Sequence, residues 1–450
     1  MMKKLLLLLA LPILAFGQQK DSLRVMQGIR FTSFSMSTQN GLFGPYPELK
    51  DYYAQSSGLE YLLELRKGNW RLKADFYGTR LIAGNPFEND SLTGKSSRYE
   101  SGLMAVDAQE KKALFIPSIL ELNYQSRLGT VGLGNFALQG SFMNEEHGRM
   151  IPSTFSGMYF KKKGLDWTLQ ASLIGAIAAR STSGFKSVSA SLAQYNPGLD
   201  TAGSRHDKTE VNAPFAVFLD AQKAVTFKGW YGQSRVESYT VPGVFQTVMF
   251  NQKLAKGPSL IHIQYLRQFK LGNGGNSDPN KAYFQQEGSS YVGLKYSHKV
   301  DKVDYFLASS YIDGKGKLLF PREWGREYLV TFQGRERQEG MGKTFAMVVG
   351  AKGKWTQGKV RHTGGVSTGV YVRPEPTDYK YNKYAMPSNQ QTNVWWKQNW
   401  RGNTHELLSM AVIKVPLSSL PISAGQTINK VDMLHLSLVY RYTLMPFKGL

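Results

Sequence analysis

Apolar and polar side chains alternate at every second residue along most of this chain, and this period constrains its fold more than any other feature. Within residues 59–66 the odd positions hold Leu59, Tyr61, Leu63 and Leu65, and the even positions include Glu60, Glu64 and Arg66. Residues 70–77 repeat the pattern after a short turn. Because successive side chains of a β-strand point to opposite faces, each strand has one apolar face and one charged face.

The connections between the predicted strands alternate in length. Eight short turns are expected, at 67–69, 126–129, 163–165, 222–224, 255–257, 300–302, 356–358 and 401–403. Nine longer polar or Pro/Gly-rich segments are expected at 37–56, 82–114, 138–156, 181–213, 233–243, 269–288, 313–342, 373–391 and 415–430. Together they join about 18 strands into an all-β, transmembrane antiparallel β-barrel with short periplasmic turns and long extracellular loops. Closure of the barrel removes the free edges of so large a sheet.

The N-terminus is predicted to be a signal peptide over residues 1–17. Lys3 and Lys4 precede an apolar stretch over residues 5–16, which is too short to span a bilayer as a helix. Residues 18–450 are expected to form one barrel domain whose first strand begins near Leu23, which disfavours an N-terminal plug domain. No later segment approaches 18 consecutive apolar residues, so a helical membrane protein is excluded.

Composition supports this interpretation and excludes several classes of protein. The 24 Tyr, 24 Phe and 8 Trp suit a barrel with aromatic side chains at both membrane interfaces. The absence of cysteine excludes disulfide scaffolds, thiol chemistry and a lipid-anchored cysteine. The formal net charge of +22 is spread along the chain, and with secretion this disfavours a nucleic-acid partner. A positive field inside a pore, which concentrates anions, is the preferred explanation.

The sequence gives no sign of an enzyme. It has no His-Glu-x-x-His, Gly-x-Ser-x-Gly or phosphate-loop motif, and its seven histidines are scattered singly. Glu145, Glu146 and His147 could ligate a metal, but three adjacent residues in a loop are more often a solvated turn. No catalytic residue, metal or cofactor is therefore predicted.

Two of the long loops are unusually rich in charge. The third carries Glu145, Glu146 and Arg149; the seventh carries Arg322, Glu323, Arg326, Glu327, Arg335, Glu336 and Arg337. One interpretation is that these residues pair with one another and fix the shape of the loops. The other is that the loops fold inward and form a charged constriction, for which the planar guanidinium of arginine suits carboxylates. Both can hold together, because a constriction must be rigid in order to select.

A resemblance to a known family rests on residues 149–157, which read RMIPSTFSG, follow the third long loop and precede a strand. This segment resembles the OprD family of outer-membrane porins, which are 18-stranded and fold their third and seventh loops into the lumen. The resemblance implies passive, substrate-selective uptake of small water-soluble solutes, with carboxylates preferred and guided by basic residues along the barrel wall.

Alternation supplies candidates for such lumen-facing basic residues: Arg71, Lys73, Lys295, Lys352, Lys354, Arg361, Lys397, Arg401 and Arg441. Most lie near short turns, so charges on the periplasmic rim are an equally weighted alternative. Because rings of basic side chains select anions, anion or carboxylate preference is predicted.

The expected function is passive diffusion of small hydrophilic solutes through the outer membrane of a Gram-negative bacterium. The alternative is a non-conducting barrel that serves as a scaffold or adhesin. Membrane lipid and lipopolysaccharide are the expected surroundings, and the sequence leaves a monomer and a homotrimer open.

Overall fold

The computed structural model describes residues 23–44, 49–97, 99–103, 113–145, 148–182, 184–192, 198–204, 211–321, 324–402, 404–417 and 431–445. The predicted signal peptide, Glu146, Arg322 and Glu323 lie outside the described residues.

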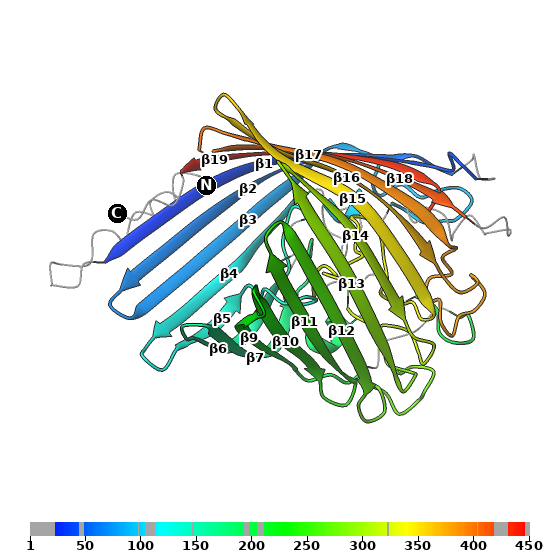
Figure 1. The fold of residues 1–450 in the computed structure, drawn as a ribbon, viewed down its shortest axis with the longest axis horizontal. Helices are drawn as coiled ribbons and strands as arrows, with labels where there is room; N and C mark the ends of the chain where they lie inside the picture. The colour runs from blue at the N-terminus through cyan, green and yellow to red at the C-terminus, as the bar shows by residue number, and fades with distance from the viewer. Residues whose placement is uncertain are drawn as a thin grey trace.

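The described chain forms one closed antiparallel barrel of 18 long strands, as predicted (Figure 1). The strands are β1 (Arg24–Asn40), β2 (Tyr52–Lys67), β3 (Trp70–Gly84), β4 (Ala113–Gln125), β5 (Thr130–Phe136), β6 (Thr154–Lys163), β7 (Trp167–Ala178), β9 (Ala216–Phe227), β10 (Trp230–Val241), β11 (Phe245–Lys256), β12 (Ser259–Lys270), β13 (Gly288–Val300), β14 (Val303–Ile312), β15 (Thr344–Gln357), β16 (Val360–Val372), β17 (Asn389–Trp400), β18 (His405–Pro416) and β19 (Met433–Met445). A two-residue strand β8 (Lys186–Ser187) pairs antiparallel with the end of β7. Two short helices, η2 (Ser101–Leu103) and α2 (Val188–Ser191), lie in the loops.

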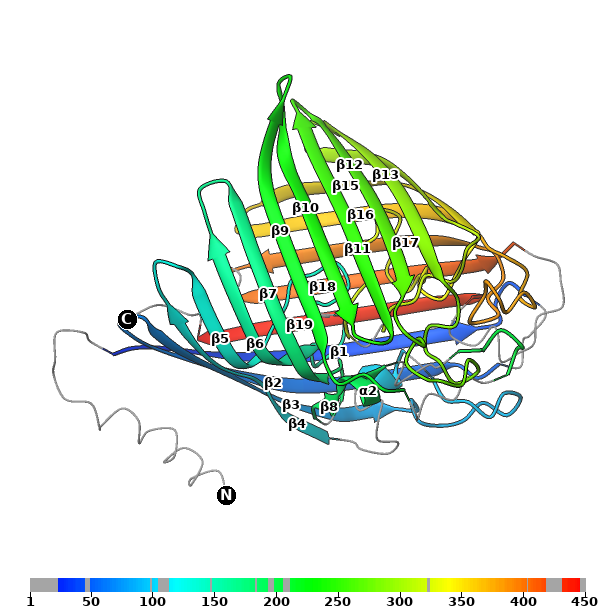
Figure 2. The same ribbon diagram turned by 90° about the horizontal axis from the view of Figure 1, so that it is seen from below.

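The first and last strands close the barrel. Strand β1 pairs antiparallel with β19 from Ile29↔Met445 to Asn40↔Met433, and every other long strand pairs with its neighbours in the chain, β7 passing directly to β9. Figure 2 shows the resulting ring of tilted strands, with β19 and β1 side by side.

Two of the predicted connections were wrong. The turn expected at 222–224 lies within β9, and the chain turns instead at Lys228 and Gly229, which both have positive φ (46° and 79°). The loop expected at 233–243 is mostly strand β10, which is joined to β11 by residues 242–244 alone. The reason is local polarity: Ser234 and Ser238 are polar on the outer face, so the apolar–polar contrast that marks a strand is lost there.

The outer wall is apolar and its short-turn end carries aromatic rings. Many large apolar side chains on the outer face are exposed, which suits a wall surrounded by lipid. Near the short turns, Trp70 and Tyr124 have ring centroids 4.8 Å apart, and His362 stacks between Trp355 and Trp396 at 5.1 Å and 5.6 Å. Such a girdle is typical of a membrane–water interface. Among the described residues, no helix is long and apolar enough to cross a membrane.

Two long loops pack together inside the other end of the barrel. We call residues 137–153, between β5 and β6, loop L3, and residues 313–343, between β14 and β15, loop L7. The ring of Phe142 in L3 stacks on that of Phe320 in L7, with centroids 3.5 Å apart and planes 6° from parallel. Both belong to a buried apolar cluster that also contains Trp324 of L7 and Tyr239 of β10. The main buried core of this barrel therefore lies between the loops and the inner wall.

Candidate functional site in the barrel lumen

Side-chain amides of the inner wall hold L7 in place. Gln268 of β12 donates from Nε2 to the carbonyl oxygen of Leu319 and accepts from its backbone N–H, both at 2.8 Å. Four residues away on the same face, Gln264 donates to the carbonyl oxygen of Tyr328 (2.9 Å) and accepts from the N–H of Val330 (2.8 Å). An amide carries both donor and acceptor, so each glutamine satisfies backbone groups of L7 that the loop leaves unpaired.

L3 and L7 are joined in the same way. The side chain of Asn144 in L3 donates to the carbonyl oxygen of Arg326 and accepts from its N–H, both at 2.9 Å. The backbone N–H of Asn144 also donates to the carbonyl oxygen of Trp324 at 3.2 Å. The indole Nε1–H of Trp324 donates to Ser191 Oγ of α2 at 2.9 Å. L7 therefore fixes L3 and the α2 segment at one side of the lumen.

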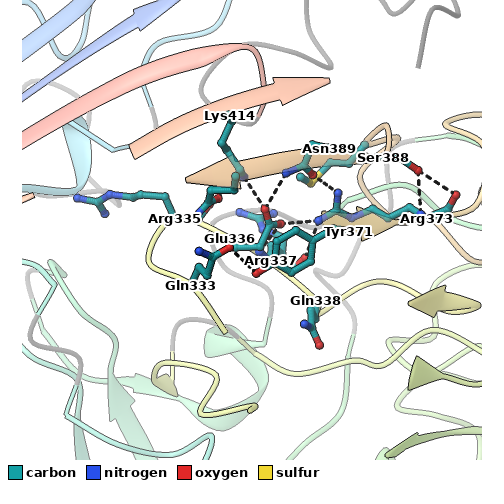
Figure 3. Close-up of polar contacts among 12 residues, drawn as sticks. Gln333, Arg335, Glu336, Arg337, Gln338, Tyr371, Arg373, Ser388, Asn389 and Lys414 are labelled. Atoms are coloured by element: carbon teal, nitrogen blue, oxygen red, sulfur yellow. Dashed lines mark hydrogen bonds and ion pairs between the residues drawn. The ribbon is translucent and has the colours of Figure 1, made fainter. Parts of the chain in front are cut away.

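Glu336 anchors the far end of L7 to the opposite wall (Figure 3). Its buried carboxylate pairs with Arg373, which follows β16, and with Lys414 Nζ of β18 at 3.1 Å. It also accepts from Asn389 Nδ2 of β17 at 3.1 Å. Burial alone would raise the pKa of the Glu336 carboxyl, but the charges of Lys414 and Arg373 outweigh it and hold that pKa at about 2. The carboxylate is ionised at neutral pH and compensates two buried cations.

Arg335 extends away from that network, as Figure 3 shows, and reaches the closure between β1 and β19. Its Nε–H donates to His435 Nε2 at 3.1 Å, so the Nδ1 of this ring carries the proton. That Nδ1 lies 2.7 Å from Thr38 Oγ1, which donates to Glu100 Oε1 at 2.5 Å. Burial raises the pKa of the Glu100 carboxyl. A buried chain of polar contacts thus joins L7, both closing strands and the loop after β3.

Several other predicted loop residues contact backbone groups, aromatic rings or an amide of their surroundings. Glu327 accepts from the backbone N–H groups of Gln338 and Glu339 at 3.1 Å and 3.2 Å. The guanidinium of Arg337 lies 4.1 Å from the ring centroid of Tyr384, and that of Arg326 lies 5.4 Å from Phe332. Glu145 accepts from Gln139 at 3.5 Å. These contacts fix the loops, and their part in a constriction stays a prediction.

A cavity of about 900 Å³ lies in the lumen on the short-turn side of this anchored loop. Its charged lining consists of Arg30, Glu60, Arg149, Lys354, Arg361, Lys397, Glu406 and Arg441. Arg149 comes from L3, and the remaining charges come from β1, β2 and the run of strands from β15 to β19. Six bases against two acids give this lining a formal charge of +4, which favours anions in a space with low-dielectric walls.

The two acids of the cavity are already paired with wall bases. Glu60 lies 3.0 Å from Arg30, and Glu406 bonds to Arg441 and to Lys397. Such pairs hold long side chains against the wall and narrow their range of positions.

The remaining predicted lumen bases are placed elsewhere. Arg71 of β3 donates to Glu64 at 2.6 Å, Lys352 of β15 lies 3.8 Å from Asp304, and Lys295 of β13 lies over the ring of Phe306. Lys73 is half-buried on β3 and lies directly across the strand pair from Glu64 of β2. The assignment of Arg401 to the lumen wall was wrong, because β17 ends at Trp400 and Arg401 is exposed in the turn with φ 50°.

The sequence analysis missed residues of the cavity lining and residues that hold the loops in place. Arg30, Glu60 and Glu406 line the cavity and lie on the charged face that alternation marks, so a stricter count of that face would have found them. Gln264, Gln268 and Asn144 had no such signal, because an amide that binds a distant backbone looks like any polar lumen residue in the sequence.

Comparisons with known proteins agree with this architecture. No model of a protein family matches the chain. No curated protein matches it either. Among solved structures, OccAB3 of Acinetobacter baumannii has a TM-score of 0.68 at 11% identity, covering 93% of this chain and 99% of that one. The BenF-like porin from Pseudomonas fluorescens Pf-5 has a TM-score of 0.66 at 10% identity, covering 95% and 99%. OpdK of Pseudomonas aeruginosa, solved with vanillate, has a TM-score of 0.61 at 11% identity, covering 93% and 98%. The likeness to OprD-type porins predicted from residues 149–157 is therefore confirmed at the level of the fold.

Proposed function

We propose that this chain is an outer-membrane porin that admits small hydrophilic solutes by passive diffusion and prefers anions, carboxylates among them. The observation that carries the proposal is the 900 Å³ lumen cavity with a formal charge of +4, inside a barrel with an apolar outer wall. A positively lined cleft raises the local concentration of anions and steers them inward.

The fold and its structural neighbours support the same function. The chain shares its barrel with porins, and one of them was solved with vanillate, an aromatic carboxylate. On this proposal residues 1–17 are a signal peptide that directs export, residues 18–450 are the barrel, and the surroundings are lipid and lipopolysaccharide of a Gram-negative outer membrane. The aromatic girdle at the short-turn end would then lie at the periplasmic interface.

The test is a planar-bilayer recording of the refolded barrel under a potassium chloride gradient. Discrete conductance steps with a reversal potential on the anion-selective side would support the proposal, and partial block by vanillate would extend it to carboxylates. Cation selectivity would contradict the anion preference. A correctly folded barrel without steps would instead favour a scaffold or adhesin, in which L3 and L7 act as a permanent plug.

A further inference from the structure

The outer wall is hollowed where strands β14 to β19 and β1 lie side by side (Figure 1). The hollow consists of two neighbouring grooves of about 430 Å³ each, both lined by Val394 and Trp396 of β17. Lys414 of β18 reaches L7 inside the lumen, and Ser409 and Ala411 lie an odd number of residues away on the same strand, so they face outward. The hollow therefore faces the lipid and not the pore.

Small side chains make the floor of the hollow. On the outer face this floor includes Ser35, Ser37, Ala351, Gly353, Gly364, Ser409 and Ala411. On the same wall nearby, the larger side chains of Leu307 and Val349 are about half exposed. Atoms that line an unfilled space lose the dispersion contacts that a neighbour would supply. A flexible apolar chain that fills the hollow is therefore favoured.

Stacked aromatic rings border the hollow on the side of the short turns. The ring of His362 lies between those of Trp355 and Trp396, with planes 10° and 19° from parallel. The two indoles are 40% and 44% exposed, whereas His362 is buried between them. On the next hairpin Trp400 stacks on His405, with centroids 5.2 Å apart. Aromatic rings in such a position lie at the level of the lipid headgroups.

The two short turns beyond these rings carry exposed cations and no acid. Lys359 lies in the turn between β15 and β16, and Arg401 lies in the turn between β17 and β18. Neither turn contains Asp or Glu in the sequence. The neighbouring turn between β13 and β14 instead has Asp301 beside Lys302. The turns next to the hollow therefore present positive charge just beyond the aromatic rings.

The same order of groups recurs on both hairpins. From the turn into β16, Lys359 is followed by His362 in the ring stack and then by Gly364 in the hollow. The hairpin of β17 and β18 repeats this order, from Arg401 through its stacked rings to Ser409. At about 3.3 Å per residue, the hollow begins about 17 Å along the strand from the cation. Cation, rings and hollow thus follow the order of phosphate, ester region and acyl chain in a phospholipid.

We propose that this face binds a phospholipid with a negatively charged headgroup, its phosphate beside Lys359 and Arg401 and an acyl chain in the hollow. A second copy of the chain fits less well, because a two-fold contact through this face would bring like cations together. The proposed function places the short turns at the periplasmic leaflet, which in an outer membrane consists of phospholipid. The inference rests on that location and does not require conduction.

The experiment measures the lipid that the intact barrel retains in native mass spectrometry. The probes are phosphatidylglycerol and phosphatidylcholine with identical acyl chains. K359Q together with R401N removes the two cations, and asparagine is chosen because Arg401 has φ 50°. The matched control, R127Q together with K256Q, removes the same charge from exposed positions at or next to two other short turns. Thermal unfolding with each lipid gives a second measure, because a bound lipid stabilises the folded barrel.

A second variant fills the hollow and leaves the charge unchanged. G364L together with S409L replaces two small outward residues by leucine. A Cβ on Gly364 would lie at least 3.5 Å from its nearest neighbours, so the wall has room for it. S234L together with S238L, on the outer face of β10 and outside both grooves, is the matched control.

We expect wild type to retain phosphatidylglycerol about tenfold better than phosphatidylcholine. K359Q/R401N should lose that preference, G364L/S409L should lose both lipids, and both control pairs should match wild type. An equal loss in R127Q/K256Q, or unchanged retention in both site variants, would overturn the site and leave only a general lipid shell.

Two further outcomes separate this site from its alternatives. Dissociation of an oligomer in G364L/S409L, with lipid retention unchanged, would make the hollow a contact between copies and the lipid proposal wrong. A barrel that retains lipid as expected but shows no conductance steps would leave the site standing while the proposed function fails. A conducting barrel that retains both lipids equally would do the reverse.

Discussion

The side-chain amide of Asn144 bonds the backbone of Arg326 in both directions, with its Nδ2 donating to the carbonyl oxygen and its Oδ1 accepting from the N–H, each at 2.9 Å. These residues are far apart in the sequence and belong to different loops. With the stacked rings of Phe142 and Phe320 beside them, they make L3 and L7 one packed body inside the barrel. We therefore expect the width of any passage past the loops to depend on this contact.

Replacement of Asn144 by alanine is expected to separate the two loops. It removes both hydrogen bonds to the partly buried backbone of Arg326, each worth about 0.5–1.5 kcal/mol. We expect larger and noisier single-channel steps than in wild type, because L3 no longer holds L7. Asn280→Ala, in an exposed turn between β12 and β13, is the matched control and should leave the steps unchanged. Steps of wild-type size and noise in Asn144→Ala would show that the contact does not set the passage.

Replacement of Gln268 by leucine is expected to loosen the start of L7. The change keeps roughly the side-chain volume but removes both hydrogen bonds to Leu319. Hydrogen exchange at the Leu319 amide should accelerate by at least tenfold, measured by mass spectrometry on peptides of L7. Gln390→Leu, on the outer face of β17, should leave that exchange rate as in wild type. Unchanged protection in Gln268→Leu would mean that other contacts hold the segment.

Glu336→Gln is expected to destabilise the barrel by about 3–5 kcal/mol at neutral pH, because it leaves Arg373 and Lys414 buried without their countercharge. Urea or thermal unfolding of wild type and variant would measure the difference.

Unfolding of wild type and Glu336→Gln at different pH values tests whether the ionised carboxylate of Glu336 is what stabilises the barrel. The pKa of Glu336 is about 2 in the folded state and 4.5 is its ordinary value, so the unfolded state binds more protons between the two. The stabilisation is therefore complete above about pH 4.5 and is lost as pH falls toward 2. The gap in stability between wild type and Glu336→Gln should narrow over this window. A gap that stays constant down to about pH 2.5 would contradict the role of the ionised carboxylate.

The cavity bases should set ion selectivity. Lys354→Gln combined with Arg361→Gln lowers the lining charge from +4 to +2, and we expect the reversal potential to shift toward zero. The shift should shrink at high salt, because screening shortens the range of the field. Lys302→Gln combined with Lys359→Gln, both in exposed turns, makes the same charge change and should shift the potential less. Equal shifts in both double variants would assign selectivity to the mouth of the barrel rather than to the cavity.

The sequence predicted the fold well where a strand shows a clear alternation of apolar and polar side chains, and poorly where it does not. Strands such as β2 and β3 carry an apolar face and a charged face, so their bounds and the turn between them followed from period 2 alone. The bounds of the strands from β9 to β11 could not be predicted in this way. Ser234 and Ser238 make the outer face of β10 polar, and Gln222, Lys223 and Ala224 resemble a turn in the sequence. The number of strands was nevertheless right, since one short turn and one loop were displaced rather than lost.

By itself the sequence determined the all-β class, the strand number and the charged inner face, because alternation is a local property of neighbouring residues. Only the tertiary structure decided that Glu336 meets Arg373 and Lys414 and that Gln268 meets Leu319. These contacts join residues that closure of the barrel and inward folding of L7 bring together. Their partners lie on different strands, and no pattern within a single strand encodes which of them will meet.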